Sequence, residues 1–417
     1  MRKIFSILLA LTLLLCLAAG CGADKTAPSS AVPATSTQTR PDDTAAVPPE
    51  TEPAIRNDIL DQSGNLLGRI DARAVVSAAD EGIFYSIFAP GENETTAAAQ
   101  YRFFRASDGK DVLLGTLEDQ GYEAVYTRTE MDGIVYTLAL TGNPFDYEPD
   151  PLWLLAFDPV RETMDKFLVS EDASPYAAMT AADGTVLVMV HEMKAPKHDR
   201  VFAFDPASGA LREVLSFLSE GDACESLRSL YADGGHLYLL RLAIRNGAAD
   251  ALYLDTYDGS YAKLSERSLQ ELIFTEEYPG ILTPGDEMTE LSLLVSGFAV
   301  RDGRYLWYEN FGVTRALLDL DTGRNLFAKD DNYSLSLGGG VPVFYFFDLG
   351  QAGPGEDVQG LYVLQNGAVE KVSLTPPDDR GMIRSVSLSP SGTRLVTFSN
   401  SDLRDPGTDA LVLWREP

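Results

Sequence analysis

Four glycines introduce β-rich segments at a fixed interval: Gly82-Ile83-Phe84-Tyr85, Gly133-Ile134-Val135-Tyr136, Gly184-Thr185-Val186-Leu187 and Gly235-His236-Leu237-Tyr238. Neighbouring copies are 51 residues apart. Branched and aromatic side chains favour strands, and a glycine before them favours a tight turn. Several short strands that repeat every 40–50 residues or so are typical of a ring of similar sheets. The repeat therefore predicts an all-β fold, a β-propeller.

A second repeated pattern places a turn of Asp, Asn, Pro, Ser or Gly between two apolar segments. It occurs at 103–109, 156–161, 203–209, 254–259, 318–323 and 363–367. These residue types supply the backbone dihedrals of tight turns, and the flanking Phe, Leu, Tyr and Val suit a pleated surface. Together the two patterns predict two hairpins, or four strands, in each repeat.

The 51-residue interval is broken once, because Gly235 and Gly303 are 68 residues apart. One insertion at about 265–290, with a helical turn at 269–275, restores the spacing. The last repeat is one strand short and ends near Trp414, whereas 59–70 reads as strand, turn and strand with no hairpin before it. We predict seven four-stranded blades, within one, over a domain at 55–417. The N-terminal strand completes the C-terminal blade, which removes two open sheet edges.

The N-terminus has the features of an export signal. Arg2 and Lys3 precede an almost unbroken apolar stretch at 4–17, which is too short to span a bilayer comfortably. The stretch ends in Leu17-Ala18-Ala19-Gly20-Cys21, which resembles the bacterial lipobox, although Ala18 stands where that motif more often has Leu. The resemblance implies a lipoprotein signal peptide at 1–20, a lipid on Cys21 and a place on the extracytoplasmic face of the cell membrane. An ordinary secretory signal is the alternative.

The segment that follows, 21–54, is rich in Ala, Pro, Ser and Thr and has almost no large apolar side chain. Such a composition cannot bury enough surface to offset its ordering entropy, so we expect a disordered tether. Of the three cysteines, Cys16 leaves with the signal peptide and Cys21 carries the lipid. Only Cys224 then keeps a free thiol, which we expect in a loop, and no intramolecular disulfide can form.

One turn resembles those of known propellers. Ser389-Pro390-Ser391-Gly392-Thr393-Arg394-Leu395 is similar to the turn of TolB-like and WD-repeat propellers, although the chain has no Trp-Asp dipeptide at these turns. The resemblance is to a superfamily and implies the fold alone.

Charge and loop length point to one face of the predicted ring. The chain has 62 Asp+Glu against 33 Lys+Arg, a net charge of −29. The long connections between hairpins and between blades emerge on the same face, and most of the negative charge lies in them. A negative face disfavours nucleic acid and anionic lipid and favours cations, basic partners or neutral ligands. Binding residues also concentrate in loops on a rigid scaffold.

Within these loops, exposed aromatic rings stand among carboxylates, as in sites for carbohydrates or peptides. We take as ligand-binding candidates Phe145, Tyr147, Glu148, Glu276, Glu277 and Tyr278.

Catalytic and metal-binding patterns are weak. The pairs Glu276-Glu277, Asp330-Asp331 and Asp378-Asp379 offer acid–base chemistry to a glycosidase, but adjacent surface carboxylates are usually only solvated. The chain lacks a Gly-x-Ser-x-Gly motif and the repeated Asp-box turn of sialidases. We predict no metal at the loop of His191 and His198, whose spacing matches no standard zinc motif. The segment 319–325 is only faintly like a calcium loop, so we predict a hairpin turn and keep calcium as the one cofactor to test.

The sequence therefore predicts a lipid-anchored, extracytoplasmic propeller that binds a ligand or a protein through its acidic loop face. Carbohydrate and envelope proteins are the partners considered. The alternative is a glycan-active hydrolase or lyase that uses rim carboxylates, and a third option is a sensor or assembly component of an envelope complex.

Overall fold

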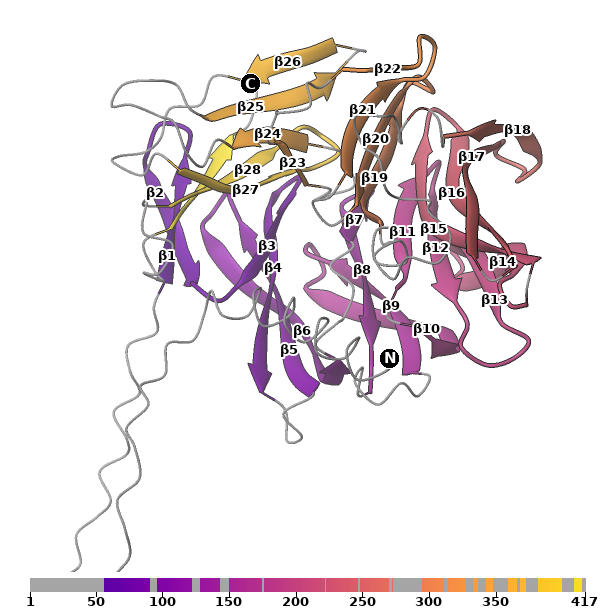
Figure 1. Cartoon of the computed structure of the whole chain (residues 1–417). Helices are drawn as coiled ribbons and strands as arrows, with labels where there is room; N and C mark the ends of the chain where they lie inside the picture. The colour runs from indigo at the N-terminus through magenta and orange to yellow at the C-terminus, as the bar shows by residue number, and fades with distance from the viewer. Residues whose placement is uncertain are drawn as a thin grey trace, which may run out of the picture.

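The computed structural model describes residues 56–90, 96–121, 128–142, 150–174, 176–221, 223–246, 248–269, 272, 295–310, 314–326, 333–336, 343–347, 359–365, 368–372, 382–399 and 409–414. Their strands form seven sheets, which stand around a common axis with the first strand of each sheet innermost. Figure 1 shows β3, β7 and β11 toward the middle and β14, β18 and β26 at the periphery. Each sheet is one blade of a β-propeller, so the predicted all-β class is confirmed.

Six blades have four antiparallel strands in chain order. The first contains β3 (Val75–Ala79), β4 (Gly82–Pro90), β5 (Thr96–Arg105) and β6 (Lys110–Gly121). The second contains β7 (Arg128–Met131), β8 (Ile134–Leu140), β9 (Asp150–Asp158) and β10 (Thr163–Ala173). The third contains β11 (Ala178–Ala182), β12 (Thr185–His191), β13 (His198–Asp205) and β14 (Ala210–Leu218).

The next three blades follow the same order. The fourth contains β15 (Ala223–Asp233), β16 (His236–Arg245), β17 (Ala248–Tyr257) and β18 (Lys263–Ser268). The fifth contains β19 (Val295–Arg301), β20 (Tyr305–Asn310), β21 (Thr314–Asp319) and β22 (Arg324–Asn325). The sixth contains β23 (Tyr333–Ser336), β24 (Val343–Phe347), β25 (Gln359–Gln365) and β26 (Ala368–Val372).

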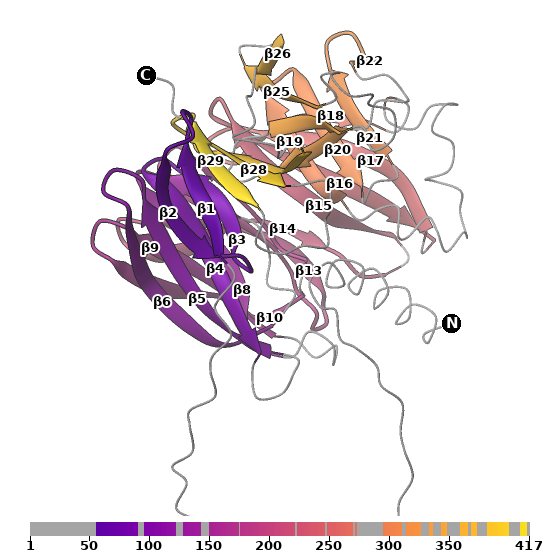
Figure 2. The same ribbon diagram turned by 90° about the vertical axis from the view of Figure 1, so that its left-hand side faces the viewer.

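The seventh blade joins the two ends of the domain. Its strands β27 (Met382–Leu388), β28 (Arg394–Ser399) and β29 (Ala410–Trp414) continue into β1 (Arg56–Asp61) and β2 (Leu66–Asp71). The predicted closure by the N-terminal segment is confirmed, but this segment adds two strands where the sequence predicted one. Figure 2 shows β1 between β29 and β2.

The direction of β1 explains the fifth strand. β1 pairs in parallel with β29 and antiparallel with β2. β2 therefore runs opposite to β29, as the fourth strand of every other blade runs opposite to the third. β2 is the regular outer strand, displaced by the insertion of β1. Its hairpin is held by burial, because Ile59 and Ile70 are 0% and 2% exposed in a cluster with Phe104 and Leu411.

The alternating strand directions give the ring two different faces. The face on which first strands end carries the turns between first and second strands and between third and fourth strands, and we call it the hairpin face. The opposite face carries the connections between second and third strands and between blades, and we call it the loop face. The predicted insertion is one of these connections, but it begins later than predicted, because 265–268 belong to β18.

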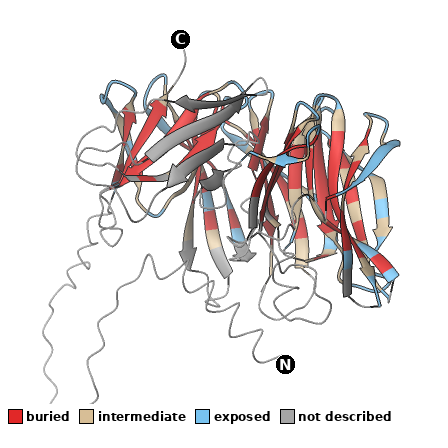
Figure 3. Cartoon of the chain, turned by 45° about the horizontal axis from the view of Figure 1, so that its top comes forward, coloured by how far each residue is buried: buried red, intermediate tan, exposed pale blue. Residues whose placement is uncertain are grey.

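The hydrophobic core lies between blades. In β8, Val135 and Ala139 pack against the first blade, whereas Tyr136 and Leu138 pack against the third. Both faces of such a middle strand are buried, which explains the nearly continuous apolar runs of the sequence. By contrast, all six residues of the outer strand β18 are exposed. Figure 3 shows the same gradient from buried inner strands to exposed outer strands and turns.

The repeated glycines have two different roles. Gly133 and Gly184 are the second residues of two-residue turns, with φ of 76° and 78° after Asp132 and Asp183 at 53° and 47°. Two successive positive φ angles define the type I′ turn that suits twisted hairpins. Gly82 is instead the first residue of β4, after the turn 80–81. Its spacing matches, but the reason for glycine is the close approach of the Phe104 carbonyl, which a Cβ would overlap.

Among the described residues, no helix is both long enough and apolar enough to cross a bilayer. The predicted signal peptide, the lipid site Cys21 and the tether lie outside the described residues.

Gly82→Ala and Gly133→Ala separate the two roles of glycine. A Cβ at Gly82 overlaps backbone that is fixed by strand pairing, so we expect a loss of about 3 kcal/mol in unfolding free energy. A Cβ at Gly133 meets no atom within 4 Å, and only the left-handed conformation opposes it, at about 1 kcal/mol. Urea denaturation of both variants measures the difference, and equal losses would contradict this account.

Candidate functional site

A hollow of about 270 Å³ opens on the axis at the hairpin face, and we call it the axial hollow. The ends of β7, β11, β15 and β19 surround it, together with the turn between β27 and β28. Its lining residues are Thr129, Glu130, Ala181, Ala182, Asp183, Tyr231, Ala232, Asp233, Gly234, Gly235, Arg301 and Pro390. Five of the seven blades thus contribute to one concave surface.

Glu130 is the most unusual group in this lining, because its side chain is ionisable yet the residue is only 6% exposed. Its two carboxyl oxygens lie 3.2 and 3.0 Å from the backbone nitrogen of Asp80, which donates to them. Burial, helped by the negative charges of Asp80 and Glu81, raises the pKa of Glu130 to about 8. Near neutral pH, the carboxyl therefore holds its proton in most molecules.

Asp80 connects this carboxyl to the closing blade. Its side chain accepts a 2.9 Å hydrogen bond from the backbone nitrogen of Ser391, and its carbonyl accepts one of 3.2 Å from the Thr393 hydroxyl. Ser391 and Thr393 belong to the turn between β27 and β28. The first, second and seventh blades therefore meet at Asp80, beside the axial hollow.

Across the hollow, Asp233 and Arg301 form an ion pair between the fourth and fifth blades. The Arg301 guanidinium donates to one oxygen of Asp233 at 2.9 Å, and the backbone nitrogen of Asp302 donates to the other at 2.7 Å. Asp183, on the β11–β12 turn, is exposed, and the described residues give it no hydrogen bond.

These contacts are part of a pattern around the axis. The first strand of a blade has one edge without a partner strand, so some of its backbone N–H groups need acceptors from elsewhere. Side chains of a neighbouring first strand supply two of them: the Ser387 hydroxyl accepts from the Ala78 amide at 2.6 Å, and the Thr180 hydroxyl accepts from the Ala232 amide at 3.2 Å. Glu130 and Asp233 do the same for the amides of Asp80 and Asp302, which lie in the turns that follow β3 and β19.

The sequence analysis missed the charged residues of the axial hollow, although an alignment of the blades contains the signal. At the penultimate position of the first strand, other blades have small or apolar side chains: Ala78, Ala181, Ala232, Val300 and Ser387. In the second blade, Glu130 stands at this penultimate position. Asp233 and Arg301 likewise end their strands where Ala79, Met131, Ala182 and Leu388 end theirs.

The residues that the sequence analysis proposed for the loop face lie outside the described residues. These are Phe145, Tyr147, Glu148, Glu276, Glu277 and Tyr278, as well as the acidic pairs at 330–331 and 378–379. Binding at the acidic loop face therefore stays a prediction, whereas the axial hollow lies on the opposite face.

The histidine loop at the end of the third blade contains a buried pair. The ring nitrogen Nδ1 of His191 lies 2.8 Å from Asp199, whose other oxygen accepts from the Leu227 amide at 2.7 Å. Burial alone would raise the pKa of Asp199, but the hydrogen bonds from His191 and Leu227 outweigh it and hold the pKa below its ordinary value. His198 contacts Ser216 instead, at 3.0 Å. Within the described ranges, no three His, Cys, Asp or Glu side chains are grouped as metal ligands.

Two other sequence predictions fall on described residues. Cys224 is buried in β15 and not in a loop, and burial raises the pKa of its thiol. Asp319 ends β21 at the predicted hairpin turn, and Arg304 donates to its carboxylate at 2.7 and 2.9 Å. These bonds hold the pKa of Asp319 well below its usual range.

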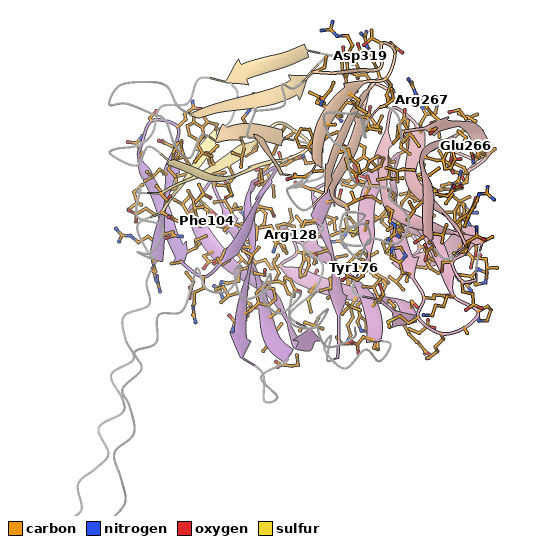
Figure 4. The ribbon with its side chains drawn as sticks, in the orientation of Figure 1. Phe104, Arg128, Tyr176, Glu266, Arg267 and Asp319 are labelled. Atoms are coloured by element: carbon orange, nitrogen blue, oxygen red, sulfur yellow. The ribbon has the colours of Figure 1, made fainter. Side chains whose placement is uncertain are left out.

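Figure 4 separates peripheral from central charges. Asp319 and Glu266 lie at the periphery, whereas Arg128 lies toward the middle of the ring. Arg128 reaches from the second blade into the first, where it donates to the Val75 carbonyl and the Ser86 hydroxyl at 3.1 and 2.8 Å.

No protein-family model matches the chain, and no curated protein matches it. Among solved structures, the chain is similar to the β-propeller domain of the Trilobed protease from Pyrococcus furiosus, with 12% identity, a TM-score of 0.48 and coverage of 82% of this chain and 96% of that one. It is also similar to an acylaminoacyl peptidase from Pyrococcus horikoshii, with 12% identity, a TM-score of 0.46 and coverage of 83% and 52%. A putative 6-phosphogluconolactonase from Bacteroides fragilis has 15% identity, a TM-score of 0.41 and coverage of 81% and 99%. At these identities the likeness concerns the fold alone.

Glu130 gives the protein a pH-dependent stability of defined sign. Its pKa in the folded state is above the ordinary value of 4.5, so the proton stabilises the fold. This contribution is fully present below about pH 4.5 and is lost as the pH rises through about 8, at up to about 1.4 kcal/mol per pH unit. Glu130→Gln is neutral and keeps an acceptor for the Asp80 amide, so it should flatten this dependence and stabilise the fold at pH 8. Urea denaturation from pH 5 to 8.5 measures both effects.

The matched control is Glu171→Gln, at an exposed position of β10. We expect it to keep the pH dependence of the wild type. A wild-type stability that does not fall between pH 5 and 8 relative to Glu130→Gln would contradict the burial of a protonated carboxyl.

Proposed function

We propose that this protein is a binding module whose ligand site is the axial hollow. The observation that supports this proposal is the convergence of polar groups from separate blades on one concave surface at the axis. Glu130, Asp233 and Arg301 are held there by hydrogen bonds to backbone or to one another. Groups fixed in this way lose little freedom when a ligand binds, which favours affinity.

The size of the hollow limits what it accepts. Its volume of about 270 Å³ is that of about nine water molecules and lies just below the range of about 300–1,000 Å³ for small-molecule pockets. It therefore suits one functional group or one side chain of a larger ligand. Two of its three carboxyl groups are already engaged, Glu130 by the Asp80 amide and Asp233 by Arg301 and the Asp302 amide. A binding role is favoured over the hydrolase or lyase alternative for this site.

We also propose that the module is exported and tethered to the extracytoplasmic face of the membrane through Cys21. This part rests on the lipobox-like sequence and on the composition of 21–54. The first described strand, β1, begins on the loop face, because it runs parallel to β29. The tether would therefore join the domain on the side opposite to the axial hollow, which leaves the hollow open to the extracytoplasmic solution.

A steric block tests the proposed site. We expect Ala182→Trp to fill the hollow, because Ala182 lines it. Ala207→Trp is the matched control on the hairpin face of the same blade, at an exposed turn position outside the lining. A thermal-shift screen of amines, amino acids, short peptides and oligosaccharides should give ligands that stabilise the wild type and Ala207→Trp but not Ala182→Trp. Ligands that stabilise all three proteins equally would place the site elsewhere, and turnover of an oligosaccharide would favour the enzyme.

Fractionation tests the anchor separately. Full-length protein with Cys21→Ala, expressed in a bacterial host, should move from the membrane fraction to the soluble extracytoplasmic fraction, because the proposed anchor is the lipid on Cys21. Detergent phase partitioning of the wild type and the variant measures this shift. Retention of the variant in the membrane fraction would overturn the lipoprotein proposal without affecting the ligand site.

A further inference from the structure

We propose that the axial hollow binds a primary ammonium group, on a polyamine or on a lysine-rich peptide, and that this group displaces the proton of Glu130. The inference rests on the proposed function, because it names the ligand chemistry of the same site. It is carried by the burial of Glu130, by its remaining acceptor capacity and by the charges around the hollow.

Among the described residues, few donors use the acceptor capacity of Glu130. A carboxylate has about four lone-pair positions, and the described residues offer Glu130 a single donor, the Asp80 amide, shared between both oxygens. A buried carboxyl with unmet lone pairs is costly to ionise, which is why it keeps its proton. An ammonium group has three N–H donors and a full positive charge. It would supply both the missing hydrogen bonds and the counter-charge.

The charges that face Glu130 favour a cation. Asp80 and Glu81 on the β3–β4 turn act on Glu130 directly. The hollow that Glu130 lines also has Asp183 on the β11–β12 turn, and Asp233 with Arg301 at the ends of β15 and β19. The β27–β28 turn contributes the uncharged Pro390. Arg301 is the one cation of the lining, and Asp233 already neutralises it. Asp183 therefore adds a negative charge, and ionised Glu130 adds a second.

Other ligand classes fit less well. An anion would meet Asp183 and Asp233, and Arg301 would have to leave its partner to bind it. A sugar ring usually stacks on an exposed aromatic side chain, but the aromatic residue of the lining, Tyr231, is only 5% exposed. A bare metal ion needs several ligands at about 2–2.6 Å, and the described residues bring no such group together. An organic ammonium group instead binds through N–H hydrogen bonds, which are longer than metal–ligand bonds and do not require a closed set of ligands.

The exchange is balanced without any further reactant. The ammonium group enters with its positive charge, the Glu130 carboxyl releases one proton to water, and the resulting carboxylate pairs with the ligand. At pH 7 Glu130 is mostly protonated, so almost one proton should leave for each ligand bound. The affinity should then rise up to tenfold for each pH unit between 6 and 8.

Isothermal titration calorimetry of the whole domain tests the proposal, with spermidine and tri-lysine amide as probes and tri-glutamate and a neutral trisaccharide as counter-probes. Titrations at pH 7 in two buffers of different ionisation enthalpy count the protons released. We expect at least one cationic probe to bind the wild type with release of nearly one proton. Spermidine alone would identify a small amine, and tri-lysine alone a basic peptide, as the natural source of the ammonium group.

Three variants assign the effect to the hollow. Glu130→Gln should abolish the proton release and weaken binding about tenfold, whereas Asp183→Asn should weaken binding with the proton release intact. Glu171→Gln should change neither. Binding of the cations without proton release, binding unaffected by Ala182→Trp, or no binding of either cation overturns the inference. Binding of a counter-probe that Ala182→Trp abolishes also overturns it, but leaves the axial hollow as a ligand site.

Discussion

The unpaired inner edges of the first strands are the constraint on which the centre of this ring depends. A ring of radial sheets brings seven such edges toward one axis. N–H groups at these edges, and in the turns that follow them, need acceptors, and in four described places a side chain from the first strand of a neighbouring blade provides one. These hydrogen bonds are directional, so they fix the orientation of neighbouring blades more closely than apolar packing alone. They also explain why acidic and hydroxyl side chains occur in a region that is otherwise small and apolar.

The same need for acceptors places hydroxyl and carboxyl side chains near the axis. Ser387 and Thr180 satisfy an amide with a neutral hydroxyl, whereas Glu130 does so with a group that can carry charge. Because ionisation of the buried Glu130 carboxyl is unfavourable, its pKa is raised and it keeps its proton near neutral pH. A structural requirement and a potential binding function therefore meet in one residue, and its substitution by Gln separates them, because the amide keeps the acceptor and loses the charge.

The fold could be predicted from the sequence to a large extent because the repeat is periodic. The interval of the glycines and the Asp-rich turns gave the strand order, the blade boundaries and the return of the N-terminus to the last blade. The insertion of β1 in parallel was not predictable, because Ile59 and Leu60 suit either strand direction. Gly82 shows a related limit: its spacing matches that of Gly133, but contact with the Phe104 carbonyl, and not a turn, requires it.

The candidate site was harder to predict, because its residues are far apart in the chain. Loop length and charge directed attention to the loop face, where irregular segments are easy to recognise. Glu130, Asp233 and Arg301 are instead single departures within regular strands, and they become visible only when blades are aligned with one another. The approach of Asp80 to Glu130, 50 residues away, follows from the ring and from no local pattern.

The position of β1 has a mechanical consequence. A force on the tether would enter the domain at Arg56, the first residue of this strand. An outer strand could peel away by breaking one ladder, but β1 is held by β29 on one side and by β2 on the other. Such a load would be divided between the two ends of the polypeptide, because the strand nearest the proposed lipid site is paired with strands from both.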